Sequence, residues 1–468
     1  MKPLLVSLFS VCFVPATVCG QDEIIVAPQS AQKMDVALDA LFEPGKVWNQ
    51  TDAEVETAWK EKGFRWSSAN AKDRGTIRRD NPQMGGLTLK IFGGAQGAEE
   101  VAFLFKDGKL SEIAIAVWNK GDSKDAEISE KQFLAMVDST TRELSKRIAP
   151  RFEDRGRDRG SASRAERRMW VGKDTLAQLE YSGGKERVNT SYYTNRTEQV
   201  FQGEFIRIRL LPKPASLIGL NDALNAKTGG TASVTRATLA KSVKRESNGD
   251  VFIPGIPMVD QGDKGYCAVA SAARVFNYYG VPADQHDMAQ VSGNAAGGGG
   301  TNPDEMVEAM KKISGKYRTR FQTELDMDYT SRKYESFMRK YNTVARKIGK
   351  KQLDTDNYIY LFQGLDPEVL REVNGAGAPY AKFIKIVQDN VNKGVPVMWA
   401  LQLGMFPEEG LKARQLSGGH MRLIIGYNTE KGQIIFSDSW GAGHEMKRMS
   451  SQDASAATMG LYLLQPAM

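Results

Sequence analysis

A polar segment near the middle of the chain separates two stretches that each have the mixture of apolar and polar residues expected of a folded domain. This segment, residues 223–250, contains Gly229-Gly230 and several Ser, Thr and Lys residues, which is typical of a linker. A chain of 468 residues is also too long for one ordinary domain. The sequence therefore predicts two folded domains, residues 21–222 and residues 251–468, joined by this linker.

Residues 1–20 have the pattern of a secretory signal peptide. Lys2 gives a positive start, residues 4–14 are apolar, and small residues precede a cleavage site after Gly20. A lipid anchor on Cys19 is the alternative, but the residues before it fit a lipoprotein signal poorly. We therefore expect export, with the mature protein secreted or periplasmic. The apolar run is too short to span a bilayer and no later segment offers about twenty apolar residues, so stable membrane insertion is not expected.

Composition and cysteine content limit the classes of function that this protein can have. The apolar fraction, 41%, and the charged fraction, 25%, are those of a soluble globular protein. A formal net charge of +7 is too small an excess on this length to predict nucleic-acid binding. Once the signal peptide is removed, Cys267 is the one cysteine left, so no internal disulfide can form. A lone thiol in an exported protein invites oxidation, which favours a chemical role, and a small buried apolar residue is the alternative.

Residues 21–222 are expected to form an α+β domain of unknown role. Two capping boxes predict helices, and a Lys-Asp-Gly-Lys turn predicts a β-hairpin. In order along the chain, these features and an alternating strand lie at Thr51–Glu54, 106–109, Ser129–Gln132 and 201–211. The charged segment 151–168 is expected to be a solvated loop, with a docking patch for an acidic partner as the alternative. No catalytic constellation is recognisable in this domain.

Cys267 is expected at the start of a helix. Residues 268–279 are good or neutral helix formers without Gly or Pro, and Gly280 is a natural C-terminal cap. The N–H groups at a helix N-terminus stabilise a thiolate and lower the pKa of the thiol. Gln261 lies six residues before the cysteine. A loop of that length lets its side-chain amide and the Cys267 N–H point at one oxyanion.

The search for a base is short because the sequence has three histidines. His420 begins an apolar strand that turns near Thr429 and returns to Asp438. A hairpin centred on Thr429 places His420 directly opposite Asp438, with Cβ atoms about 5 Å apart on one face of the sheet. The carboxylate would then fix the tautomer of the imidazole and stabilise its cation. His286 is expected in a surface turn, and His444 in a structural role.

The other parts of residues 251–468 predict a mixture of helix and antiparallel sheet. A helix is expected at 381–392, followed by an apolar strand at 395–400, and a final strand at 461–464. Residues 317–378 are polar and are expected to be largely helical, forming part of a substrate wall. The fold class of this domain is therefore α+β as well.

With Gln261, Cys267, His420 and Asp438 in this order, the second domain resembles the papain-like cysteine peptidases. The Ile-Pro start and the string Asp-Ser-Trp-Gly from Asp438 onward resemble the bacterial branch related to bacteriocin-leader-processing, or double-glycine, peptidases. The spacing of 153 residues between Cys267 and His420 is close to that of the family. Ala268 departs from both branches, since papain has Trp after its Cys and the bacterial branch usually has Gly-Pro.

The resemblance implies a papain-like fold, in which the helix that bears the Cys packs on an antiparallel sheet. It implies that Cys267, His420 and Asp438 form a catalytic triad and that Gln261 belongs to the oxyanion hole. A glycine pair occupies the matching place before a helix in such enzymes, where it lets the substrate backbone approach closely. Gly299-Gly300 is the corresponding substrate-binding candidate, and a flexible loop is the alternative.

The predicted function is that of a secreted cysteine peptidase that hydrolyses peptide or protein substrates. No metal or cofactor is expected, because the histidines and the one cysteine lack the close spacing of a zinc set. The alternatives are a transglutaminase-like acyltransferase, in which an amine intercepts the thioester, and an inactive binding protein on a peptidase scaffold. The first domain is expected to restrain or target the peptidase and to be cut away near residues 241–246. A permanent recognition domain is the alternative.

Overall fold

A computed structural model describes residues 33–466 apart from several internal segments. The residues left out within this range are 44, 46, 82–83, 121–127, 150–151, 158–164, 190–196, 217–233, 235, 263–265, 282, 287, 289–302, 317–318, 327–331, 355–363 and 409–417. The predicted signal peptide, residues 1–20, lies outside the described residues.

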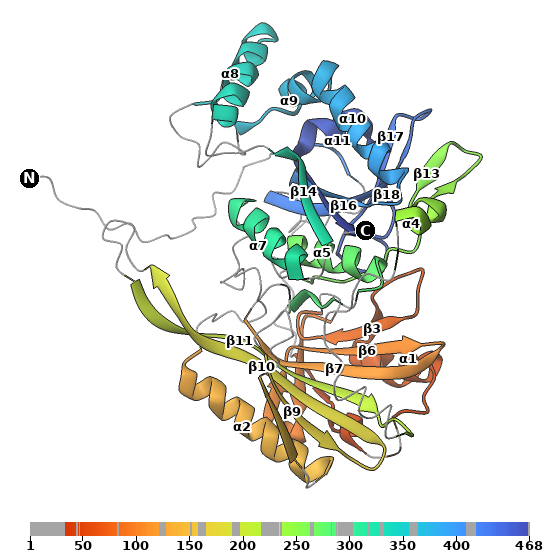
Figure 1. Ribbon diagram of the computed structural model, residues 1–468, viewed down its shortest axis with the longest axis vertical. Helices are drawn as coiled ribbons and strands as arrows, with labels where there is room; N and C mark the ends of the chain where they lie inside the picture. Colours follow the sequence, from red (N-terminus) through yellow and green to blue (C-terminus); the bar gives the residue numbers. More distant parts are fainter. Residues whose placement is uncertain are drawn as a thin grey trace, which may run out of the picture.

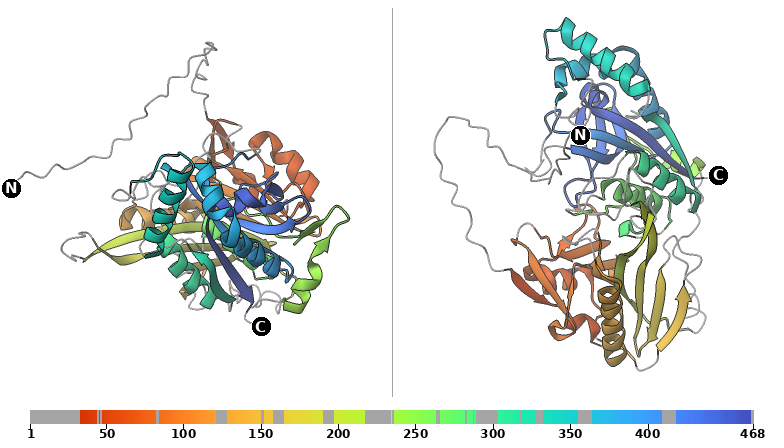
Figure 2. Two further views of the ribbon diagram at one scale, coloured as in Figure 1. Left: turned by 90° about the horizontal axis from the view of Figure 1, so that it is seen from above. Right: turned by 90° about the vertical axis from the view of Figure 1, so that its left-hand side faces the viewer.

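The buried apolar side chains form separate cores in the two halves of the chain. One core runs from Val36 to Leu210, and the cores of the second half run from Leu239 to Leu464. We call residues 33–216 the N-terminal domain and residues 234–466 the C-terminal domain. Figures 1 and 2 show the two domains at opposite ends of the molecule, with helix α5 (Cys267–Tyr278) close to the boundary between them.

The N-terminal domain is built on an antiparallel sheet of eight strands, and helix α2 (Glu130–Arg147) packs along one face of it (Figure 1). In spatial order the strands are β2 (Arg65–Trp66), β3 (Arg74–Arg78), β6 (Glu100–Lys106), β7 (Lys109–Asn119), β11 (Thr197–Pro212), β10 (Thr175–Asn189), β9 (Glu166–Val171) and β8 (Phe152–Arg157). The remaining elements are the small sheet β1 (Met34–Ala37), β4 (Leu87–Ile91) and β5 (Gln96–Ala98), helix α1 (Asp52–Trp59), and short 3-10 turns at Asp39–Phe42, Lys60–Lys62 and Phe92–Gly94.

Local signals in this domain predict local structure correctly. Thr51 caps α1 and Ser129 caps α2, each in a capping box with the residue three positions later. The predicted hairpin is β6–β7, and its turn places Asp107 and Gly108 at positive φ. Helices and antiparallel strands together give the domain its α+β composition.

The prediction of a loop over residues 151–168 is wrong in part. Residues 152–157 form β8, which pairs with β9 at the edge of the sheet, and residues 166–168 belong to β9. The charged composition of this segment led to the prediction of a loop. It is also compatible with an edge strand, which is held by backbone pairing on one side only. Charged residues are common on edge strands, where they discourage pairing with other chains.

The C-terminal domain contains a second mostly continuous antiparallel sheet. In spatial order its strands are β12 (Lys244–Arg245), β13 (Asp250–Phe252), β16 (Gly418–Asn428), β15 (Val397–Leu403), β19 (Thr458–Pro466) and β14 (Thr319–Asp326), while β17 (Gln433–Ser437) pairs with β16 and β18 (Lys447–Ser450). The predicted strands near 395–400 and 461–464 are β15 and β19. The largely helical prediction for 317–378 is confirmed by helices at 332–347 and 367–374, but it is wrong at β14, a polar strand that is held by its backbone pairing with β19.

Helices cover both faces of this sheet. Helices α5 and α7 (Pro303–Lys316) share one core with it, on the side toward the N-terminal domain, and four later helices pack on the opposite face (Figure 1). Those on the opposite face are α8 (Arg332–Lys347), α9 (Pro367–Asn374), α10 (Gly377–Val391) and α11 (Ser451–Ala457). The predicted helix at 381–392 is the main part of α10. No helix among the described residues is long and apolar enough to cross a bilayer.

The structure differs from the predicted linker over residues 223–250 in its described part. Residues 236–242 form helix α4 (Arg236–Ser242), and residues 244–245 form β12, which pairs with β13. Leu239 is buried in the core of the C-terminal domain, and its backbone lies so close to Gly394 that a Cβ there would overlap it. The buried side chain of Leu239 therefore holds this segment against the sheet, which composition alone does not reveal.

Candidate active site

Cys267 is the first residue of α5, as predicted. Its neighbour Tyr266 occupies the N-cap position without a side-chain hydrogen bond to the helix, so the thiol lies at an uncapped N-terminus. The helix ends before Tyr279, and Gly280 follows at φ 74°. Residues 268–276 of α5 are all buried, which holds the half-buried Cys267 against the sheet.

His420 and Asp438 lie side by side behind this thiol. The ring nitrogen Nε2 of His420 donates to Oδ1 of Asp438 over 2.9 Å, and the imidazole lies near enough to the Cys267 thiol for each group to shift the pKa of the other. His420 is 7% exposed and Asp438 is fully buried. Trp440 stacks on the imidazole with ring centroids 4.3 Å apart and planes inclined by 15°. The structure thus brings these three predicted site residues together.

The predicted register of the hairpin that carries them is wrong. Its last pair is Asn428 with Gln433, so the turn is centred after Thr429, and a bulge follows between Ile424 and Gly426. Asp438 consequently lies just beyond the end of β17 and diagonal to His420, not directly opposite it. The pair still meets because diagonal neighbours on one face remain within reach of side chains of this length.

The charges of the three groups support one another. Burial alone would raise the pKa of the Cys267 thiol, but the hydrogen bond and charge of His420 lower it below its usual value. Burial alone would lower the pKa of His420, but its contacts with Asp438 and Cys267 raise it. Both shifts favour a thiolate beside an imidazolium, the form in which a cysteine is nucleophilic.

A buried arginine that the sequence did not single out completes this network. Arg422 lies on the same face of β16 as His420, and its Nε is 2.8 Å from Oδ1 of Asp438. Its guanidinium also pairs with Glu408 at 2.8 Å, which in turn pairs with Lys447. Burial alone would raise the pKa of Asp438, but Arg422 and His420 lower it to about 2. The available signal was one charged residue in an otherwise apolar strand, two positions after the histidine.

Arg274 joins the nucleophile helix to the end of β17. Its side chain is 1% exposed, and its Nη1 donates to the carbonyl oxygen of Asp438 over 2.8 Å. Its Nε donates to the carbonyl oxygen of Pro257 over 2.9 Å. A single residue of α5 therefore fixes the position of the helix relative to two loops of the site.

Gln261 lies in a turn that is anchored to the chain after Asp438. Its backbone N–H donates to the carbonyl oxygen of Ser439 over 2.8 Å, and its side chain is buried. The preceding residue, Asp260, accepts a hydrogen bond at its carbonyl oxygen from the side chain of Gln285 over 3.0 Å. These contacts hold the candidate oxyanion residue beside the turn that carries Trp440.

Residues 253–459 match the model of the Peptidase_C39 like family. The match confirms the resemblance of the C-terminal domain to the bacterial branch of cysteine peptidases. Among solved structures, the chain is similar to the peptidase domain of Streptococcus ComA, a bi-functional ABC transporter involved in a quorum-sensing pathway. The two are 16% identical with a TM-score of 0.23, over 45% of this chain and 99% of that one. No curated protein matches the sequence.

Two further predictions concern residues near the site. The substrate-binding candidates Gly299 and Gly300 lie outside the described residues. The prediction of a surface turn for His286 is wrong, because its side chain is 7% exposed and packs edge-on against Tyr266 with ring centroids 5.9 Å apart. Arg207 of the N-terminal domain pairs with Asp284 in this turn at 3.1 Å, and such a contact has no signal in the local sequence. His444 contributes its carbonyl oxygen, which accepts the Asp438 N–H over 2.9 Å.

The described residues hold no group of three or more His, Cys, Asp or Glu side chains placed to bind a metal ion.

Proposed function

We propose that the protein is an exported, papain-like cysteine peptidase that hydrolyses peptide bonds through Cys267, His420 and Asp438. The observation that carries the proposal is the hydrogen-bonded pair of His420 and buried Asp438, which lies near the thiol at the start of α5. The match of residues 253–459 to a peptidase family supports the same reaction class. The pattern of residues 1–20 supports export.

In the first step, the Cys267 thiolate attacks the carbonyl carbon of the substrate, forming a C–S bond and an oxyanion. The Cys267 N–H, which has no partner within the helix, and the side-chain amide of Gln261 stabilise that oxyanion. The C–N bond then breaks as His420 gives its proton to the leaving amine. Asp438 keeps the imidazole oriented and stabilises its cation, so the transfer proceeds without rotation of the ring.

In the second step, water hydrolyses the thioester. Neutral His420 takes a proton from the water as its oxygen bonds to the acyl carbon, and a second oxyanion forms in the same place. Collapse of this intermediate breaks the C–S bond and releases the carboxylic acid. The thiolate and imidazolium are restored, so neither a cofactor nor a metal enters the balance of the reaction.

Substitution of the nucleophile and the base tests the proposal. We expect Cys267→Ala and His420→Ala each to lower peptide hydrolysis more than about a thousandfold, because each removes a group that forms or breaks bonds. Hydrolysis of a peptide library by the mature protein gives the measurement, and circular dichroism checks that the variants stay folded. Turnover in Cys267→Ala above about a thousandth of wild type would show that another group is the nucleophile.

A primary amine added to the wild-type reaction separates hydrolysis from acyl transfer. The peptidase proposal expects the free carboxylic acid as the main product at moderate amine concentration. An amine-capped product in excess would assign the protein to the acyltransferases, with the same thiol as nucleophile.

A further inference from the structure

We infer that the N-terminal domain is a permanent part of the proposed active site and that its residue Arg78 positions Gln261. The inference rests on the proposed function and names a role for the domain that its own sequence does not disclose. The residues that it concerns are those of the Gln261 turn, defined here as residues 260–262.

Arg78 ends strand β3 at the face of the N-terminal domain that meets the C-terminal domain. Its guanidinium is oriented within its own domain by Asp80, through hydrogen bonds of 2.9 and 2.6 Å. Across the boundary, Nη1 of Arg78 lies 3.3 Å from Oδ1 of Asp260, the first residue of the Gln261 turn. The side chain of Arg78 is 10% exposed, so this ion pair is largely shielded from water.

The guanidinium of Arg78 also occupies the space where a side chain at Gly262 would begin. A Cβ added to Gly262 would overlap Nη2 of Arg78, and the residue has φ 66°, where glycine is favoured. The N–H of Gly262 donates to Oδ1 of Asp260 over 2.9 Å, on the same oxygen that pairs with Arg78. One guanidinium thus contacts the residues on both sides of Gln261.

The opposite side of the Gln261 turn rests on the chain that follows Asp438. The N–H of Gln261 donates to Ser439, and Oδ2 of Asp260 would lie 3.0 Å from a Cβ at Gly441. The turn is therefore held between the N-terminal domain and the segment that carries Trp440. Arg78 supplies the contact from the N-terminal domain, while Ser439 and Gln285 hold the turn from the C-terminal domain.

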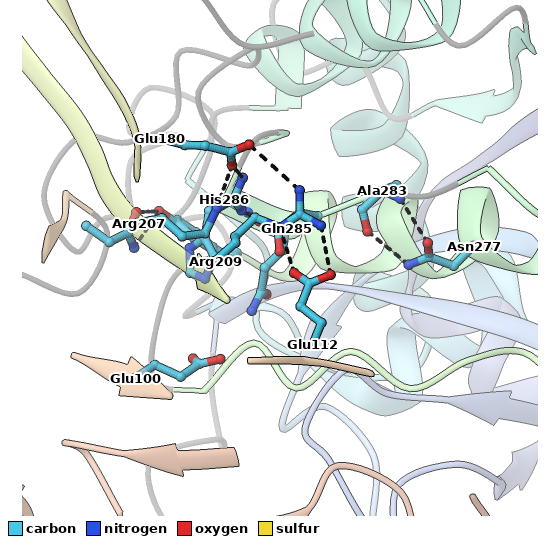
Figure 3. Close-up of polar contacts among 12 residues, drawn as sticks. Glu100, Glu112, Glu180, Arg207, Arg209, Asn277, Ala283, Gln285 and His286 are labelled. Carbon is cyan, nitrogen blue, oxygen red and sulfur yellow. Dashed lines mark hydrogen bonds and ion pairs between the residues drawn. The ribbon is translucent and has the colours of Figure 1, made fainter. Parts of the chain in front are cut away.

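Other contacts place the N-terminal domain against further segments of the site. Asn119 at the end of β7 donates to the hydroxyl of Tyr266, the residue before the nucleophile, over 3.3 Å. Ser68 donates to Glu445, beyond the Trp440 turn, over 2.9 Å. The far end of this boundary is polar as well, and Figure 3 shows its side chains Glu180, Arg207, Arg209, Gln285 and His286.

These contacts favour a permanent domain over a detachable one. A pro-segment that restrains an enzyme must release activity when it leaves. Here departure of the domain would remove Arg78 from the Gln261 turn and Asn119 from Tyr266. We therefore expect the loss of this contact to slow the chemical step.

Arg78→Met tests the inference, with Arg79→Met as the matched control. Arg79 is the next residue along the chain, and its ion pair with Glu99, at 2.8 Å, stays inside the N-terminal domain. We expect Arg78→Met to lower kcat by about tenfold to a hundredfold with KM changed less than about twofold, because the turn is loosened around an oxyanion donor. The rate of Cys267 alkylation should stay at the wild-type value in both variants, since the thiol and its histidine are untouched.

Hydrogen exchange at the Gln261 amide gives a readout that needs no substrate. We expect this amide to exchange at least about tenfold faster in Arg78→Met than in Arg79→Met, because its bond to Ser439 opens more often. Equal protection in the two variants would overturn the inference, even if the wild type hydrolyses peptides. If the wild type hydrolyses no peptide, the proposed function fails, and the exchange result alone decides the role of Arg78.

Asp260→Asn keeps the test decisive if Arg78→Met fails to fold. Asparagine retains an acceptor for the Gly262 N–H but loses the charge that pairs with Arg78. We expect a fall in kcat like that of Arg78→Met, and no further fall when both substitutions are combined, because each removes the same contact. Additive losses, or a kcat above that of the wild type in either variant, would overturn the inference.

Discussion

Asp438 in the C-terminal domain and Glu180 in the N-terminal domain are both buried carboxylates that pair with arginine. Burial alone would raise the pKa of each. The neighbouring cations instead lower the pKa of Asp438 to about 2 and that of Glu180 to about 2. By charge and burial the two groups are nearly equivalent.

The two carboxylates differ in the groups that pair with their negative charge. Figure 3 shows Glu180 beside Arg207 and Arg209, which lie at 2.6 and 3.7 Å. Arg167 lies at 3.1 Å, so the cations paired with Glu180 among the described residues are arginines. Asp438 faces Arg422, the imidazole of His420 and, at 3.9 Å, Lys447. Arginine keeps its proton at every pH that a protein meets, whereas histidine gains and loses one near neutrality. A strongly lowered pKa therefore does not by itself identify a catalytic carboxylate. What identifies it is a neighbouring group that can gain and lose a proton.

The largest effect that distinguishes the two carboxylates is expected in catalysis. Asp438→Ala should lower kcat/KM by about a thousandfold, because His420 loses its orienting acceptor. Asp438→Asn should stay within about tenfold of the wild type, since the amide oxygen can still accept from Nε2. Glu180→Gln is the matched amide control, and its folded form should keep the wild-type kcat/KM. Equal losses in the two Asp438 variants would mean that charge, not orientation, is what His420 requires.

For the stability of the fold, we expect the substitution at Glu180 to have the larger effect and the substitution at Asp438 the smaller. Glu180→Gln should lower the free energy of unfolding by about 3 kcal/mol, because it leaves buried guanidinium groups without their shared carboxylate. The loss in Asp438→Asn should be smaller, since Arg422 keeps its pair with Glu408 at 2.8 Å. Urea denaturation at neutral pH measures both. A Glu180→Gln midpoint equal to that of the wild type would show that the cluster is neutral for stability.

The same pKa values predict how the stability of the fold changes at acidic pH. A carboxyl whose pKa is lower in the folded than in the unfolded state stabilises the fold above its unfolded pKa, and this stability is lost as pH falls toward the folded value. For Glu180, a pKa lowered from 4.5 to about 2 corresponds to about 3 kcal/mol. We expect the urea midpoint to be steady from about pH 7 to 5 and to fall steeply between about pH 5 and 2.

The variant Glu180→Gln should make that fall shallower, because one of the titrating groups is gone. An unchanged slope would assign the acid sensitivity to other carboxylates, such as Asp250, whose pKa is also lowered by Arg448.

The smallest effect concerns the cation beside Asp438. Arg422→Met should let the full charge of Asp438 act on His420, raising the pKa of the imidazole and moving the basic limb of kcat/KM upward by about one pH unit. The methionine keeps apolar contact with Phe436, whose ring lies 4.6 Å from the guanidinium. Arg448→Met, which removes a cation paired with Asp250, is the control. A basic limb at the same pH in both variants would show that Arg422 does not tune the base.

The parts of the fold that could be predicted depend on neighbours in the sequence. Capping at Thr51 and Ser129, the β6–β7 turn and the helix after Cys267 each need only a few adjacent residues, and each is present in the structure. The meeting of His420 and Asp438 was expected from strand alternation, which survives an error of register as long as both residues stay on one face.

The parts that could not be predicted depend on distant segments. The bulge near Ile424 and the pairing of β8 are set by how strands meet, and neither leaves a mark in composition. No sequence motif marks Arg78 or Arg422. The role of each depends on the segment that the fold places opposite it, and that segment is distant in the sequence. The burial of His286 likewise needs the other domain.

The position of Leu239 has a consequence for how such genes can be recombined. Because Val234 and Leu239 already belong to the core of the C-terminal domain, a break at residue 251 would cut through that core. Among the described residues, the main core of the first domain ends at Leu210, and the first residue packed on the core of the second is Val234. A replacement first domain would still have to present a guanidinium to Gly262, so the two halves of the gene are constrained to evolve as a pair.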